Sequence, residues 1–144
     1  MRKDTILFSK DGSIGIAYKV EKDEKAMTSS ALLHLKIIDD GILPDYLTLV
    51  LNSTIVKLQA ERDAGGSIIQ HWKPDEIEEV IIPIIDKDRQ ELLSGIVKES
   101  FKLKAVSEGI IESLKLIVDS AIEVDENEGK RIFEELEATG VLKL

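Results

Sequence analysis

A proline-free stretch over residues 86–124 constrains the fold of this chain most strongly. Apolar residues recur in it at steps of seven, with others between them: Ile96, Leu103, Ile110, Ile117 and Val124, then Leu93, Val106, Leu114 and Ala121. Such spacing places apolar side chains in one stripe along an α-helix. A second stripe lies on another side of the same helix: Val97, Phe101, Ile111, Val118 and Ile122. The pattern therefore predicts one long amphipathic helix that packs on its own domain and, in a coiled-coil-like manner, on a partner helix.

Strand patterns precede this helix. Residues 5–9 and 14–20 are predicted strands, and Lys10-Asp11-Gly12-Ser13 between them is a turn signal, so the two should form a hairpin. Residues 26–38 predict a third strand in which apolar residues alternate with polar ones. The three strands indicate a small β-rich portion at the start of the chain.

Two helices and a loop follow the strands. Pro44 suits the first turn of a helix, Asn52-Ser53 breaks or caps it, and residues 54–64 form a second helix that Gly65-Gly66 stops. After the loop, Pro74 opens a short helix, which leads into an apolar strand closed by Pro83.

The order of these elements predicts a mixed α/β (α+β) fold. The chain has 144 residues, 43% of them hydrophobic, which suffices for one small domain and an appended element. We expect a domain portion at 1–85, a spacer or dimerisation helix at 86–124 and a C-terminal segment at 125–144. In that segment an interruption at 125–129 precedes a short helix over 130–138, ended by Gly140.

The composition argues against catalysis. The chain has no cysteine, which excludes a disulfide framework, a thiolate zinc site and a cysteine nucleophile. Its two histidines, His34 and His71, are far apart, and neither has a partner histidine at metal-ligand spacing. Phosphate-loop, nucleophile-elbow and dinucleotide motifs are lacking. We therefore expect a non-enzyme with no metal or cofactor, and the short apolar run near Met1 predicts a soluble cytoplasmic protein without a membrane span.

The charge is unevenly distributed. The net charge is -9, yet residues 1–73 hold ten basic and ten acidic side chains, so the whole acidic excess lies in the helical half. This suggests different partners for the two halves, although a solvated helix face is the commoner explanation of an acidic helix.

Candidate DNA contacts gather around the loop that follows Gly65-Gly66. Gln70 can pair with adenine in the major groove, His71 follows it, and the glycines allow close backbone approach. An ordinary exposed loop is the competing interpretation, and from residue type alone it is favoured. Trp72 could stack on a base, but a single tryptophan is more often part of the core.

In this order the segments resemble the specificity subunit of type I restriction-modification systems. The segment at 4–20, DTILFSKDGSIGIAYKV, resembles the family's hairpin, and LPDYLTLVLNSTIVKLQAERDAGG at 43–66 resembles its helix pair. The loop, helix and strand that finish a target-recognition domain are matched by GSIIQHWKPDEIEEVIIPII at 66–85. The spacer helix that docks on the modification subunit is matched by KESFKLKAVSEGIIESLKLIVDSAI at 98–122.

The resemblance implies a reader of double-stranded DNA in a complex where the modification subunit methylates adenine and a restriction subunit cuts. By position it assigns the DNA contacts Lys10, Ser13, Ser67, Ile69, Gln70 and His71. Two lysines beside these segments, Lys19 after the hairpin turn and Lys73 after Trp72, are further predicted DNA contacts. The apolar stripe of the long helix predicts the partner-helix contacts Ile96, Leu103, Ile110, Leu114, Ile117 and Ala121. The family's domain has a further portion before the hairpin, so the chain is expected to match the C-terminal part of one domain and its helix.

Two alternatives stay open. One is an assembly or dimerisation protein that acts through the long helix and binds no DNA, as a homodimer or by pairing of half-subunits. The other is the detached recognition domain of a fused adenine methyltransferase.

Overall fold

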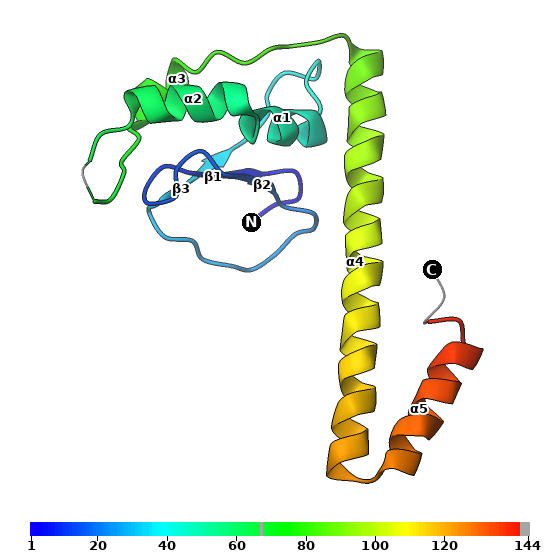
Figure 1. Ribbon diagram of the computed structural model, residues 1–144. Coiled ribbons are helices and arrows are strands. Elements are labelled where there is room, and N and C mark those ends of the chain that lie inside the picture. The colour runs from blue at the N-terminus through cyan, green and yellow to red at the C-terminus, as the bar shows by residue number, and fades with distance from the viewer. Residues whose placement is uncertain (67, 142–144) are drawn as a thin grey trace. The chain divides into compact units, whose positions relative to one another are not determined.

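The computed structural model describes residues 1–66 and 68–141. The chain divides into two compact units, Met1–Val97 and Lys98–Leu144, and helix α4 (Lys87–Glu123) runs across the boundary between them (Figure 1). All three strands and helices α1 to α3 belong to the first unit.

The first unit contains a three-stranded antiparallel sheet of order β2-β1-β3. Its strands are β1 (Ile6–Ser9), β2 (Ala17–Lys19) and β3 (Leu32–Leu35). In the register, Ile6 lies opposite Lys19 on one side and Leu35 on the other. The predicted hairpin is confirmed. The third strand is much shorter than the predicted 26–38, because only residues 32–35 lie opposite β1.

The helices of the first unit are α1 (Pro44–Leu51), α2 (Thr54–Asp63) and α3 (Pro74–Glu78), which cover one face of the sheet (Figure 1). Pro44 and Pro74 occupy first-turn positions as predicted, because a missing N–H costs nothing there. The buried core joins sheet and helices: Ile6, Phe8, Ala17, Leu51, Val56, Ala60 and Trp72.

Trp72 belongs to this core. Its side chain is 1% exposed, and its ring centroid lies 5.7 Å from that of Phe8 at an interplanar angle of 55°. The core interpretation is therefore confirmed over base stacking. A buried aromatic at this position also anchors the loop that precedes it.

Asn52 lies where the helical path is interrupted between α1 and α2. Its side-chain Oδ1 accepts a hydrogen bond from the Ala17 amide at 3.1 Å, and its Nδ2 donates to the Ala17 carbonyl at 2.8 Å. The amide thus imitates a strand partner for β2 and ties the helix pair to the sheet.

The predicted strand before Pro83 is wrong. In the described part of the chain, residues 80–85 pair with no strand, and helix side chains bind their backbone instead. Gln59 forms two 2.9 Å hydrogen bonds with Ile81, one to its carbonyl and one from its amide. Tyr46 Oη donates to the Pro83 carbonyl at 2.7 Å. These bonds satisfy the extended backbone without a ladder.

Gln90 attaches the start of α4 to the first unit. It is 1% exposed, and its Nε2 donates to the carbonyls of Ile85 at 2.8 Å and Gly41 at 3.1 Å. Its Oε1 accepts from the Leu43 amide at 3.0 Å. One buried amide thereby satisfies three backbone groups.

The second unit is a helical hairpin of the later part of α4 and helix α5 (Glu126–Ala138). The Asp125 carboxylate caps α5 by accepting from the amides of Asn127 at 2.8 Å and Glu128 at 2.9 Å. The predicted interruption at 125–129 is therefore too long, because this cap starts the helix at Glu126. No helix among the described residues is long and apolar enough to cross a membrane.

Candidate nucleic-acid interface

Two loops that are far apart in the sequence lie side by side in the first unit. One is the hairpin loop, residues 10–16 between β1 and β2. The other is the α2–α3 loop, of which residues 64–66 and 68–73 are described. The Trp72 amide donates to the Lys10 carbonyl at 2.8 Å, and the Gly12 amide donates to the Gln70 carbonyl at 2.9 Å. The structure therefore joins the two segments that the sequence predicted to face DNA.

Backbone hydrogen bonds close the base of the α2–α3 loop. The Gly65 amide donates to the His71 carbonyl at 3.1 Å, and the His71 amide donates to the Gly65 carbonyl at 2.8 Å. At Gly66, φ is +113°, and a Cβ there would lie 2.1 Å from the Ile69 carbonyl oxygen. Only glycine fits such a turn. These bonds hold the base of the loop, while the side chains of Ile68, Ile69 and Gln70 are exposed.

Asp11 binds cationic or polar groups from both loops. Its Oδ2 lies 2.7 Å from Lys10 Nζ, and its Oδ1 lies 2.9 Å from His71 Nδ1. The hydrogen bond from Lys10, and then that from His71, hold the pKa of Asp11 below its ordinary value of 3.8. An ionised carboxylate only accepts, so Nδ1 carries the imidazole proton and Nε2 is the nitrogen left for an outside partner.

The other predicted contacts around these loops are exposed. Ser13, Ile69, Gln70 and Lys73 all lie at the surface, whereas Lys10 is partly buried. Lys73 Nζ lies 2.9 Å from Glu76 Oε1, so this cation has a carboxylate partner of its own. Ser67 lies outside the described residues.

Lys19 does not lie on this surface. Its side chain is 7% exposed, and Nζ lies 2.6 Å from Asp45 Oδ1 and 3.2 Å from Glu21 Oε2. This burial contradicts its prediction as a DNA contact, because a lysine held inside by carboxylates cannot reach a phosphate. Its structural effect is to join β2 to α1.

The sequence did not predict a cationic hollow at the end of the sheet opposite the hairpin loop. Arg2, Lys3 and Lys36 line a hollow of about 550 Å³ together with Asp4, Thr5, Ile37 and Pro44. Lys36 directly follows β3, and Arg2 and Lys3 lie close before β1. No sequence signal identified them, because only the antiparallel pairing of these strands brings the three together.

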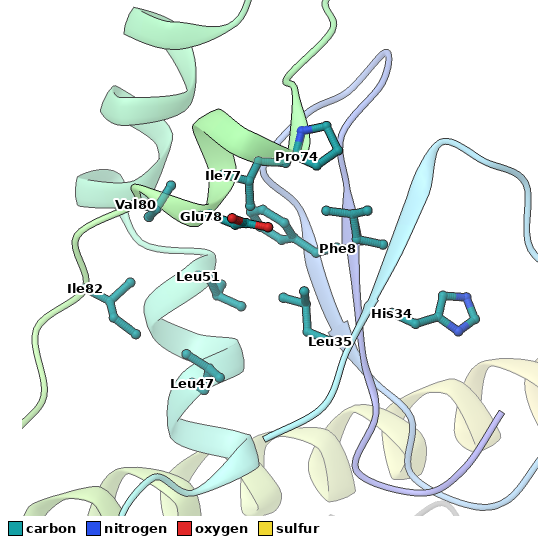
Figure 2. Close-up of a pocket in the computed structure, with 11 residues that line it drawn as sticks. Phe8, His34, Leu35, Leu47, Leu51, Pro74, Ile77, Glu78, Val80 and Ile82 are labelled. Carbon is teal, nitrogen blue, oxygen red and sulfur yellow. The ribbon is translucent and has the colours of Figure 1, made fainter. Parts of the chain in front are cut away.

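An apolar groove of about 420 Å³ opens between the sheet and its helices. Figure 2 shows the labelled side chains from β1, β3, α1, α3 and the segment after α3 around it. The lining is mainly aliphatic: Leu33, Leu35, Leu47, Leu51, Pro74, Ile77, Val80 and Ile82, with Phe8, His34 and Glu78. His34 Nε2 forms a 2.7 Å hydrogen bond with Thr28 Oγ1. The mainly aliphatic lining suits contact with apolar groups rather than acid–base catalysis.

The predicted partner-helix residues differ in exposure. Ile96 and Leu103 are each 59% exposed and Leu114 is 45% exposed, while Ile110, Ile117 and Ala121 are partly buried. Ile117 and Ala121 line a groove with Phe133 of α5. Within the second unit, α5 therefore contacts the C-terminal end of the stripe. Among the described residues, no group of three or more His, Cys, Asp or Glu side chains could hold a metal ion.

Comparison with solved structures identifies the fold. The chain is similar to the S subunit of a type I restriction-modification system from M. genitalium, with a TM-score of 0.70 and 20% sequence identity. The match covers 85% of this chain and 33% of that one, so the chain spans about a third of the S subunit's length. The likeness confirms, at the level of fold, the α+β class and the resemblance seen in the sequence. No family model and no curated protein matches the chain.

Proposed function

We propose that this chain is a non-catalytic DNA-recognition element of the specificity-subunit type, which binds double-stranded DNA through the hairpin loop and the α2–α3 loop. The observation that carries the proposal is the hydrogen-bonded junction of these two loops, in a chain whose fold matches part of an S subunit. Recognition side chains need a rigid support, and Trp72 in the core supplies one at the end of the loop.

The exposed side chains divide into base and backbone contacts. Gln70 carries the amide that pairs with adenine in the major groove, and His71 Nε2 accepts from a base-edge amino group, such as N6 of adenine or N4 of cytosine. Lys10, Lys73 and Ser13 contact phosphates. Because Asp11 and Glu76 already pair with Lys10 and Lys73, these two lysines add little to the electrostatic part of the affinity. The cationic hollow adds phosphate contacts through Arg2, Lys3 and Lys36.

Helix α4 serves assembly in this proposal. Its exposed apolar residues, including Leu92 at 66%, Ile96 and Leu103, present a surface that a modification subunit or a second half-subunit covers. The same surface supports the second candidate function, an assembly or dimerisation protein that binds no DNA. A recognition domain detached from a fused adenine methyltransferase would use the same loops.

Fluorescence anisotropy with a mixed-sequence duplex tests the proposal. Binding should weaken as salt rises from low to physiological concentration; contacts from Lys10 and Lys73 alone give a log–log slope of about -2. The double variant Gln70→Ala/His71→Ala should weaken binding. Gln59→Ala should not, because the Gln59 side chain binds the backbone of Ile81 and not either loop. Absence of binding at both salt concentrations, with and without the modification subunit, contradicts DNA recognition and favours the assembly function.

A further inference from the structure

The tip of the α2–α3 loop presents two isoleucines to solvent. Ile68 is 94% exposed and Ile69 is 58% exposed. Neither belongs to the core or to the residues packed against it. Burial of such side chains stabilises a fold, so leaving both outside gives up stabilisation that the core could have provided. An adjacent apolar pair on a loop with a fixed base is suited to contact with an apolar group of a binding partner.

Gln70 follows Ile69 directly, and its side chain indicates which apolar group the two isoleucines contact. Its carbonyl is held by the Gly12 amide at 2.9 Å, which fixes its backbone while its side chain is exposed. A glutamine amide matches the N6 and N7 atoms of adenine in the major groove. The thymine paired with that adenine presents its C5-methyl group in the same groove, where apolar side chains contact it. The tip thus carries side chains for both halves of an A·T pair.

We propose that Ile68 and Ile69 contact the C5-methyl groups of thymine in the major groove and, with Gln70, make the chain selective for A·T pairs. This inference rests on the proposed DNA-binding function. An isoleucine wedge in the minor groove is the physical alternative, and it predicts no sensitivity to the methyl group, because the C5-methyl lies in the major groove.

Replacement of thymine by deoxyuridine removes only the methyl group and tests the proposal. The full chain, with the modification subunit if binding needs it, first selects its sequence from a randomised duplex pool. Each thymine of that sequence is then replaced in turn, and anisotropy measures the affinity. At contacted thymines we expect a loss of about fourfold, the value of one methyl removed from contact. Replacements outside the site should have no effect.

Variants assign the effect to the two isoleucines. Ile68→Ala/Ile69→Ala should bind thymine and deoxyuridine duplexes equally, whereas Ile81→Ala should retain the discrimination, since Ile81 is also exposed, at 77%, but lies outside the loop. Salt-sensitive binding with equal affinity for both duplexes at every position overturns the inference and leaves the proposed function standing. Discrimination that persists in the double variant also overturns it. Failure to bind any duplex overturns both.

Discussion

His71 Nδ1 lies 2.9 Å from Asp11 Oδ1, which joins side chains 60 positions apart in the chain. The same carboxylate binds Lys10 through its other oxygen. A short bridge between the backbones of Asp11 and His71 accompanies the side-chain contact. Asp11 therefore adds a side-chain link to the backbone hydrogen bonds that join the hairpin loop to the α2–α3 loop, although it has no DNA contact of its own in the proposal.

The titration of Asp11 reports this junction. Its pKa is lowered first by Lys10 and then by His71. A lowered pKa in the folded state means that the ionised carboxylate stabilises the junction above pH 3.8, and that this contribution disappears as the pH falls through the lower folded-state value. Lys10→Ala and His71→Ala should each raise the pKa of Asp11 toward 3.8, measured by carboxyl NMR. Lys57→Ala, which removes an exposed lysine from α2, should leave it unchanged; equal shifts in all three variants would refute the junction.

Loss of the Lys19 ammonium should destabilise the first unit strongly. Lys19→Met removes one member of the ion pair with Asp45, whose side chain is 9% exposed, and breaking a buried pair in this way costs about 3–5 kcal/mol. Denaturant unfolding measures the change. Lys36→Met, at an exposed lysine, should cost less than about 0.5 kcal/mol. Lys19→Met/Asp45→Leu should recover part of the loss, because the double variant removes both charges of the buried pair.

The same pair gives an alkaline limit of stability. Burial lowers the pKa of Lys19, but hydrogen bonds to Asp45 and Glu21 outweigh it and raise that pKa above 10.5. A raised folded-state pKa means that the stabilisation is complete below pH 10.5 and is lost as the pH rises through the folded value. Unfolding free energy should therefore fall above pH 10.5 in the wild type and fall less in Lys19→Met/Asp45→Leu.

Gln90 should contribute more stability than Gln59. Gln90→Ala removes the partner of two carbonyls and one amide at a site that is 1% exposed, which should cost about 3 kcal/mol. Gln59→Ala frees the Ile81 backbone at an exposed position, where water replaces the lost bonds, and should cost about 1 kcal/mol. Equal losses in thermal or denaturant unfolding would contradict the assignment of Gln90 as the attachment of α4.

Substitution of alanine for two helical glycines should change the stability in opposite directions. At Gly109 an added Cβ meets nothing within 4 Å, so Gly109→Ala should stabilise α4 by about 1 kcal/mol. At Gly129 the Cβ would lie 2.7 Å from Ala121 Cβ, and overpacking costs about 1–3 kcal/mol, which exceeds the gain in helix propensity. Circular dichroism melting should show the difference. Stabilisation by Gly129→Ala would refute the close packing of α4 and α5.

A charge in the α4 stripe should prevent assembly. Ile110→Asp places a carboxylate among apolar residues that a partner helix would bury, and it should abolish self-association or capture by a modification subunit. Sedimentation velocity and co-purification measure this. Lys104→Asp, which changes an exposed lysine of the same helix, should leave assembly intact. A wild-type chain that is monomeric and captures no modification subunit would rule out the interface.

Local patterns in the sequence predicted the elements but not all of their partners. Pro44, Pro74 and the steps of seven in residues 86–124 placed the helices correctly, because capping and amphipathic spacing act within a few turns. The apolar run before Pro83 is the clearest failure. It has the composition of a strand, but strand formation depends on a neighbour, and Gln59, Tyr46 and Gln90 take that place.

In the candidate site too, some features follow from the sequence and others only from the tertiary structure. The sequence by itself determined the hairpin, the glycine-containing loop that carries Gln70 and the long helix, since these follow from residue type and spacing. Only the tertiary structure decided that Asp11 bridges Lys10 and His71, and that Lys19 is buried with Asp45 rather than facing DNA. Both results depend on contacts between residues that are distant in the chain, and the burial and pairing of a charge are set by such contacts rather than by its neighbours in sequence.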